Sequence, residues 1–172
     1  KKKEYELKLI KEKALERQKI LLKEFGTIGS LVYIIRVKSY ENREYIIKIG
    51  ESRRGVQGRF NEHKSKYEEC LLLDCFLVNK SKDFETFLHN HENIKYNRVT
   101  DLSGHKNERE LFLVGKNLSY QMLLDIINNN ILTYKSLCYN RLPRAQRTMI
   151  VAHIIKNNYD KECLYSLGTF TN

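Results

Sequence analysis

The fold of this chain is decided by two neighbouring segments, Leu31-Val32-Tyr33-Ile34-Ile35-Arg36-Val37 and Tyr45-Ile46-Ile47-Lys48-Ile49-Gly50. Both are rich in β-branched and aromatic residues, which is typical of strands. Residues 38–43 between them are polar and predict a turn, so the two strands form a hairpin. Because the apolar residues are nearly continuous, both faces of the hairpin are expected to be partly covered.

The residues that follow predict a helix, a strand and a second helix. From residue 55 to 69 the apolar residues recur at helical spacing, and residues 71–78 form a third strand that is apolar apart from Asp74. A further helix is expected over residues 81–94. This order predicts an α+β fold with a small three-stranded antiparallel sheet flanked by helices, which we expect to occupy residues 29–115.

Helices are expected on both sides of that domain. Residues 1–25 contain neither Gly nor Pro, and their apolar residues are spaced for an amphipathic helix that ends at Gly26. We interpret residues 1–26 as a connector or a short coiled coil, through which the chain could associate with itself. Helical patterns return over residues 107–114 and 119–127.

The C-terminal part, residues 116–172, is predicted to be a helical extension. Pro143 suits the first position of a last helix, which reaches about residue 157. Within this part, Arg141, Arg144 and Arg147 are spaced by three and share one face. Such a row either follows DNA phosphates or keeps the helix soluble, and the charge of the chain favours DNA contact.

The charge of the chain points to an anionic partner. The 172 residues include 31 Lys and Arg against 21 Asp and Glu, a formal net charge of +10. Such a surplus concentrates polyanions, of which nucleic acid is the commonest and an anionic membrane the main rival. No apolar run approaches the ~20 residues that span a bilayer, and no signal peptide is visible. We therefore expect an intracellular protein, in the cytoplasm or nucleus of a host cell, with no membrane partner.

The cysteines and histidines do not predict a zinc site. The cysteines show no CxxC pair and no metal-ligand spacing with histidine, and their neighbours are apolar. They are Cys70, Cys75, Cys138 and Cys163. Buried, reduced thiols are the expected interpretation, in agreement with an intracellular protein.

The residues in the first half of the chain resemble the GIY-YIG nucleases. This family begins with a hairpin that carries a Gly-Ile-Tyr-like and a Tyr-Ile-Gly-like tripeptide, and Leu31-Val32-Tyr33 and Lys48-Ile49-Gly50 are similar to them. The next helix in the family carries an arginine with a His or Tyr four residues later, as Arg59 and His63 do. That spacing places both side chains on one helical face.

The later part of the resemblance indicates a subgroup. Glu85 stands where the family has a metal-binding glutamate, on a helix after the third strand. The segment from Glu85 to His89 and the tripeptide Glu110-Leu111-Phe112 look most like the T5orf172 or MUG113 subgroup of viral and phage proteins. The resemblance covers about 80 residues, and the order of its motifs is more specific than any one of them.

The resemblance implies a magnesium-dependent DNA endonuclease. Tyr33 would orient or deprotonate the attacking water with help from Lys48. Arg59 would bind the scissile phosphate. Apart from the resemblance, Lys66 lies on the same helical stripe as Arg59 and His63, and we expect it to contact DNA. His63 would assist proton transfer or hold the tyrosine.

The metal ligand implied by the resemblance is a glutamate. Glu85 would hold one Mg²⁺ ion, with Glu110 as the alternative. Glu108 competes for the same role, and Glu85 could instead be an ordinary solvated charge.

Two departures from the family motif affect these expectations. Leu31 replaces the first glycine, and Lys48 replaces the second tyrosine. Lys48 could act as a base if its pKa is lowered, or it could contact phosphate. A DNA-binding module without catalysis is therefore the first alternative, and a helix-mediated interaction protein that docks through residues 1–25 is the second.

Overall fold

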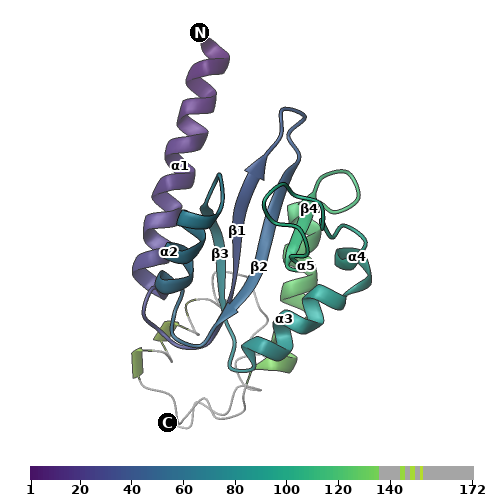
Figure 1. Ribbon diagram of the computed structural model, residues 1–172. Helices are drawn as coiled ribbons and strands as arrows, with labels where there is room; N and C mark the ends of the chain where they lie inside the picture. The colour runs from purple at the N-terminus through teal and green to yellow at the C-terminus, as the bar shows by residue number, and fades with distance from the viewer. Residues whose placement is uncertain (136–143, 146–147, 150–151, 153–172) are drawn as a thin grey trace.

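A four-stranded antiparallel sheet forms the centre of the molecule (Figure 1). The structure, a computed structural model, describes residues 1–135, 144, 145, 148, 149 and 152. The strand order is β3-β1-β2-β4. The strands are β1 (Leu31–Ser39), β2 (Tyr45–Ser52), β3 (Leu71–Leu77) and β4 (Leu111–Val114).

The predicted hairpin is confirmed as the pair β1–β2. Its register places Tyr33 opposite Gly50, and shifts between Arg36 and Lys38. On its other side, β1 pairs antiparallel with β3, with Tyr33 opposite Cys75. Strand β1 is thus central, and its residues are held from both sides.

The prediction of three strands was wrong, because residues 111–114 form a fourth strand instead of the end of a helix. Strand β4 pairs with β2, with Lys48 opposite Leu111 and Tyr45 opposite Val114. An apolar run this short fits a strand and a buried helix equally well, so its spacing could not distinguish them. Pairing with β2 decides in favour of the strand, because the free edge of β2 offers hydrogen bonds that a short isolated helix cannot match.

Five helices and one 3₁₀ turn are described. They are α1 (Lys2–Phe25), α2 (Gln57–Lys66), α3 (Ser81–Asn90), α4 (Glu92–Lys95), α5 (Tyr120–Asn130) and η1 (Ile131–Tyr134). The helix predicted over residues 81–94 is broken at His91, whose backbone is extended. Among the described helices, none combines the length and the apolar character needed to cross a membrane.

The helix predicted from Pro143 lies mostly outside the described residues. Residues 144, 145, 148, 149 and 152 are helical. Arg144 is exposed. Arg141 and Arg147 lie outside the described residues, so their predicted contact with DNA stays a prediction.

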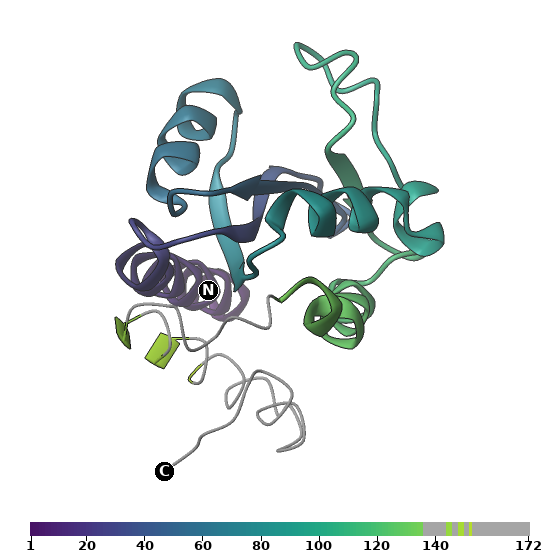
Figure 2. The same ribbon diagram turned by 90° about the horizontal axis from the view of Figure 1, so that it is seen from below.

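Two apolar cores cover the two faces of the sheet. Alternate residues of β1 belong to different cores, Tyr33 and Ile35 to one and Val32 and Ile34 to the other. The first core contains residues of α1 and α2, and the second contains residues of α3, α4 and α5. Figures 1 and 2 show α1 and α2 to the left of the sheet and α4 and α5 to the right. Helix α5 lies beyond the boundary expected at residue 115, yet its residue Leu123 packs in the second core.

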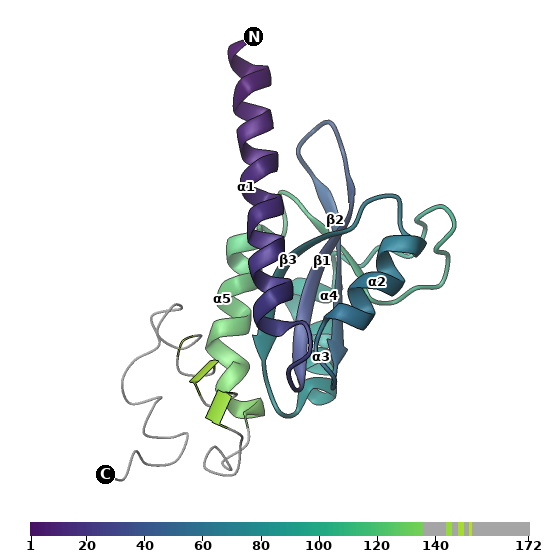
Figure 3. The ribbon, with the colours of Figure 1, turned by 90° about the vertical axis from the view of Figure 1, so that its left-hand side faces the viewer.

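Helix α1 is more than the connector that the sequence predicts. Leu21 and Phe25, in its last two turns, are buried in the first core. Its first turns extend past the sheet (Figure 3), where Leu7 and Ile10 are 68% and 64% exposed. The C-terminal half of α1 is therefore part of the domain, whereas its N-terminal half is not.

Side chains of α1 also protect an edge of the sheet. Strand β3 is at the edge, where unpaired backbone groups invite pairing with other chains. Gln18 accepts a hydrogen bond from the Leu72 N–H at 3.1 Å, and Arg17 donates to the Leu73 carbonyl at 3.1 Å. Arg17 also pairs with Asp74, the polar residue within β3.

Asp74 connects the two sides of this edge. Besides its ion pair with Arg17 of α1, its carboxylate accepts a hydrogen bond of 2.6 Å from the Tyr120 hydroxyl of α5. A single carboxylate thereby joins a helix from each core to the edge strand. The N-terminus of α5 is also capped, since Ser119 accepts a hydrogen bond from the Met122 N–H at 3.1 Å.

Replacing Phe25 by alanine should destabilise the domain. Truncation of a buried phenylalanine leaves a cavity and costs about 3–5 kcal/mol, so the free energy of unfolding in urea should fall by about that amount. Ile10→Ala is the matched control on the exposed half of the same helix, where a change within about 0.5 kcal/mol is expected. Equal losses in the two variants would contradict this division of α1.

Candidate active site

A polar pocket of about 270 Å³ lies between α2 and α3, beside β1 and β2. The five residues expected to be catalytic all line it, and so does the alternative metal ligand. Its wall consists of Tyr33, Lys48, Gly50, Glu51, Arg59, Glu62, His63, Lys66, Lys82, Glu85 and Glu110. Residues up to 77 positions apart in the sequence, from Tyr33 to Glu110, therefore meet at one place.

The floor of the pocket is formed by Tyr33 lying over Gly50. The two residues are opposite each other in the β1–β2 register. A Cβ atom on Gly50 would lie 2.4 Å from the Tyr33 hydroxyl oxygen and 2.5 Å from Cζ, which is far inside van der Waals contact. The glycine of the second motif is thus required by the tyrosine of the first, because any side chain at position 50 would displace the ring.

The Tyr33 hydroxyl forms a buried hydrogen bond with His63 of α2. Its oxygen lies 2.8 Å from His63 Nε2. Burial raises the pKa of the Tyr33 phenol above its ordinary value, while the charge of Arg59 lowers it in part. Burial, together with the charge of Lys48, lowers the pKa of His63 to about 4.

Both partners of this hydrogen bond are therefore neutral near pH 7. We assign the phenol O–H as the donor and Nε2 as the acceptor, which places the imidazole proton on Nδ1. His63 Nδ1 is buried and has no hydrogen-bond partner among the described residues. A neutral imidazole held in this way can accept the phenol proton.

Arg59 occupies the more exposed side of the pocket. It pairs with Glu62 one turn later in α2, at 3.1 Å, and the two side chains are 47% and 62% exposed. Exposed pairs of this kind contribute little to stability, so the guanidinium can exchange its partner at small cost. A planar guanidinium that is free to do so suits two oxygens of a phosphate.

Lys48, at the position of the second motif tyrosine, is buried and paired with Glu110. Its Nζ lies 2.5 Å from Glu110 Oε2. Burial alone would raise the pKa of Glu110, but its hydrogen bond with Lys48 and the charge of that lysine lower it. The backbone of Glu110 is fixed as well, since its carbonyl accepts from the Ile49 N–H at 3.1 Å. The loop before Glu110 thus folds back onto the hairpin.

Glu85 points into the pocket from α3 and is almost fully buried. One of its oxygens accepts a hydrogen bond of 3.1 Å from Lys82, one turn earlier in the helix. His89, one turn later, lies 3.9 Å away through Nε2, which also contacts the Ile49 carbonyl at 2.8 Å. Burial raises the pKa of Glu85, and the hydrogen bond from Lys82 opposes that change.

The carboxylates of the pocket fit a water-rich magnesium site better than a closed one. Mg²⁺ usually keeps several waters and binds one or two carboxylates together with substrate phosphates. Glu85 and Glu110 both line the pocket and supply such oxygens. Within the described residues there is no group of three or more His, Cys, Asp or Glu side chains placed to hold a metal ion.

Glu108, the third candidate ligand, has a different role. It accepts hydrogen bonds from Tyr67 and from His105 at 3.1 Å, and pairs with Lys66 at 2.7 Å. Burial alone would raise the pKa of Glu108, but its hydrogen bonds with Lys66, Tyr67 and His105 lower it to about 2. It ties the loop before β4 to the end of α2 and does not line the pocket. Lys66, expected to bind DNA, does line the pocket and is paired with Glu108.

Three residues that line the pocket are absent from the sequence-based predictions, namely Glu51, Glu62 and Lys82. Helical spacing could have found Glu62, three residues after Arg59, and Lys82. Lys82 lies three residues before Glu85, a helical spacing that predicts an ion pair. Glu51 directly follows the motif glycine and accepts a hydrogen bond of 2.8 Å from Ser81 at the start of α3.

In the comparison with protein families, the model of the T5orf172 domain matches residues 30–130. The chain belongs to the T5orf172 domain family. This family is nuclease-related, and the matched range includes the four strands, α5 and the residues that line the pocket. Comparisons with curated proteins and with solved structures give no match.

The stability of this T5orf172 domain should depend on pH through His63. Its folded pKa of about 4 lies below the ordinary 6.5, so between these values the unfolded chain binds a proton that the folded chain does not. The contribution of His63 to the free energy of unfolding should therefore be fully present above pH 6.5 and be lost as the pH falls toward 4. This loss amounts to up to about 3 kcal/mol.

Urea unfolding at pH 7 and pH 4.5 measures this contribution. His63→Gln removes the titrating ring, so the loss between the two pH values should be smaller in the variant than in the wild type. An equal loss in both proteins would show that His63 is not held neutral.

Proposed function

We propose that this T5orf172 domain is a metal-dependent DNA endonuclease that hydrolyses phosphodiester bonds in the pocket between α2 and α3. The observation that supports it most is the meeting of a buried Tyr33–His63 pair, an exchangeable arginine and two carboxylates in one polar pocket. These are the groups that phosphodiester hydrolysis needs: a proton acceptor, a phosphate ligand and a metal ligand.

The net charge of the chain supports DNA as the substrate. The whole chain carries a formal net charge of +10. The pocket itself is lined by four glutamates as well as by four cations, Lys48, Arg59, Lys66 and Lys82. Contacts of such groups with phosphates provide most of the affinity of proteins for DNA, independently of base sequence.

The proton of the attacking water leaves through Tyr33. The hydroxyl oxygen takes a proton from the water as its own proton passes to His63 Nε2, 2.8 Å away. The resulting hydroxide attacks phosphorus, and the P–O bond to the leaving oxygen breaks. The leaving oxygen takes up a proton from solvent water and departs as an alcohol, and His63 releases its extra proton to solvent. Lys48 and Lys66 lower the pKa of His63, and a bound phosphate would offset their charge and raise it again. The base therefore gains strength when substrate is present.

Arg59 and Glu85 complete the proposed site. Arg59 leaves Glu62 and binds two oxygens of the scissile phosphate through its guanidinium. Glu85, released from Lys82, would hold Mg²⁺, with Glu110 as the alternative ligand. A bound Mg²⁺ would offset the charge on the phosphoryl oxygens and on the leaving oxygen.

A DNA-binding module without catalysis is the second candidate function. It is favoured by two features of Lys48. This lysine stands at the position of the second motif tyrosine, and its ion pair with Glu110 occupies one of the two carboxylates that could hold the metal. Such a module would bind DNA through the same cations and leave it intact.

Removing single groups from the reacting centre should abolish cleavage and spare the fold. Tyr33→Phe deletes only the hydroxyl, and Arg59→Lys keeps the charge but loses the bidentate grip. Each should lower the rate of plasmid nicking with Mg²⁺ by at least about 100-fold, the lower range for acid–base catalysis. Tyr96→Phe and Arg43→Lys are matched controls at exposed positions and should nick at the wild-type rate.

Near-wild-type rates in both Tyr33→Phe and Arg59→Lys would contradict the endonuclease proposal. Absence of nicking in the wild type, together with salt-dependent binding to duplex DNA, would favour the silent module instead.

The metal ligand can be identified by comparing two glutamates. Glu85→Gln should abolish Mg²⁺-dependent nicking while sparing or strengthening DNA binding, because a negative charge that faces phosphate is lost. Glu110→Gln leaves Lys48 buried without its partner, so it should mainly lower the stability of the fold. The Mg²⁺ concentration for half-maximal nicking and the urea midpoint together separate the two effects.

Glu92→Gln, at an exposed position in α4, is the control for both variants. Nicking that survives in Glu85→Gln and disappears in a folded Glu110→Gln would reverse the assignment.

A further inference from the structure

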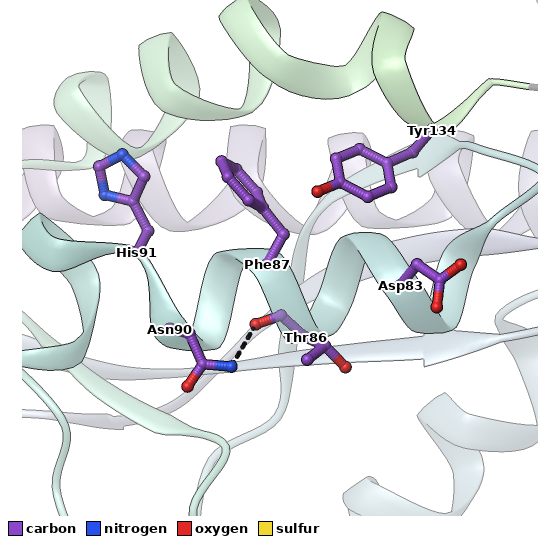
Figure 4. A pocket seen from close by; sticks show the side chains of 6 residues that line it. All are labelled: Asp83, Thr86, Phe87, Asn90, His91 and Tyr134. Carbon is purple, nitrogen blue, oxygen red and sulfur yellow. Dashed lines mark hydrogen bonds between the residues drawn. The ribbon is translucent and has the colours of Figure 1, made fainter.

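Helix α3 carries a second recess on a face next to the one that lines the active-site pocket (Figure 4). Lys82 and Glu85 face the active-site pocket, whereas the second recess has a different set of side chains. Its volume is about 360 Å³, and it is lined by Asp83, Thr86, Phe87, Asn90, His91 and Tyr134. None of these residues lines the active-site pocket.

An aromatic row forms one wall of this recess. Figure 4 shows His91, Phe87 and Tyr134 in a row between α3 and the segment formed by α5 and η1. The ring centres of Phe87 and Tyr134 are 5.5 Å apart, and those of Phe87 and His91 are 5.7 Å apart. Phe84, in the core, stacks on both Phe87 and Tyr134. The rings are therefore held in place before any ligand arrives.

The rim of the recess offers hydrogen-bond acceptors. The Asn90 amide donates to the Thr86 carbonyl at 2.9 Å, which leaves its own oxygen as an acceptor. The Asp83 side chain has neither a hydrogen bond nor an ion pair among the described residues. His91 Nδ1 accepts from the Asn93 N–H at 3.2 Å, so Nε2 carries the ring proton and can donate.

We propose that this recess binds an unpaired nucleobase with an exocyclic amino group, from a DNA strand that crosses α3 beside the active-site pocket. The source of the base rests on the proposed function, whereas the chemistry of the recess does not. Aromatic side chains stack on bases of any kind, and carboxylate and amide oxygens accept from the amino groups of cytosine and adenine. Thymine has no such group, so it should bind least well.

The arrangement of α3 supports one strand reaching both sites. A helix is about 10–12 Å across, so the two lined faces are within a few nucleotides of each other. Two exposed lysines can contact the phosphates of the strand between the two sites. They are Lys80, just before α3, and Lys82, which is 59% exposed in the first turn of α3. An apolar peptide would instead leave Asp83 and Asn90 without partners at its edge.

Free nucleotides test the recess without any need for cleavage. Titration of the isotope-labelled chain with dCMP, dAMP or dTMP, followed by amide NMR shifts, should move Thr86, Phe87 and Asn90 with dCMP and dAMP. The affinity for dTMP should be about fivefold weaker or more. Shifts confined to Arg59 and His63, or equal affinity for all three nucleotides, would overturn the proposal.

Variants identify the contacts. Phe87→Leu keeps an apolar side chain in the core but removes the ring, and should weaken dCMP binding about fivefold or more, as loss of a stacking contact does. Asp83→Asn should reduce the difference between the affinities for dCMP and dTMP. Tyr96→Leu removes a 76% exposed ring outside the recess and should change neither value. Wild-type affinities in Phe87→Leu, with the fold intact, would also overturn the proposal.

The outcome separates this inference from the proposed function. Plasmid nicking with no nucleotide-induced shifts at α3 would overturn the base site and leave the endonuclease in place. Shifts at Phe87 and Asn90 without nicking would keep the base site and overturn the endonuclease.

Discussion

The contact between the Tyr33 ring and the backbone of Gly50 is the constraint on which the candidate site depends. It requires the two residues to be opposite each other in the β1–β2 register, and it requires that position 50 has no side chain. A slip of the register by one residue would turn Tyr33 to the other face of the sheet, away from His63. Because β3 and β4 pair with the two outer sides of the hairpin, they fix this register and with it the position of the hydroxyl group.

The charges around the pocket form pairs of unequal strength. Arg59, Lys48, Lys66 and Lys82 each pair with a glutamate. The Arg59 side chain is 47% exposed and that of Lys48 is 8% exposed. Screening by water makes the exposed pair easy to exchange for a phosphate, whereas separating the buried pair would leave an uncompensated charge. In the proposed endonuclease, Arg59 is therefore the cation that would bind the substrate phosphate. Lys48 is a fixed charge that, in addition to burial, lowers the pKa of His63.

The edge strand β3 is protected by the same helix that extends furthest from the domain. Arg17 and Gln18 of α1 bond to its backbone, and Asp74 links it to Tyr120 of α5. These contacts cover backbone N–H and C=O groups of β3 that could otherwise pair with a strand of another chain and cause aggregation. The exposed first half of α1 takes no part in this protection, and self-association through it remains a prediction.

The sequence by itself determined the hairpin, the helix with Arg59 and His63, the third strand and the helix with Glu85, because each has a clear local pattern. It did not determine β4, since four apolar residues fit a strand and a helix equally well. The Lys48–Glu110 pair, the protection of β3 by α1 and the aromatic recess on α3 were decided by the tertiary structure alone. Each joins residues that are distant in the chain and that come together only when the strands have paired. Local spacing in the sequence carries no information about such partners.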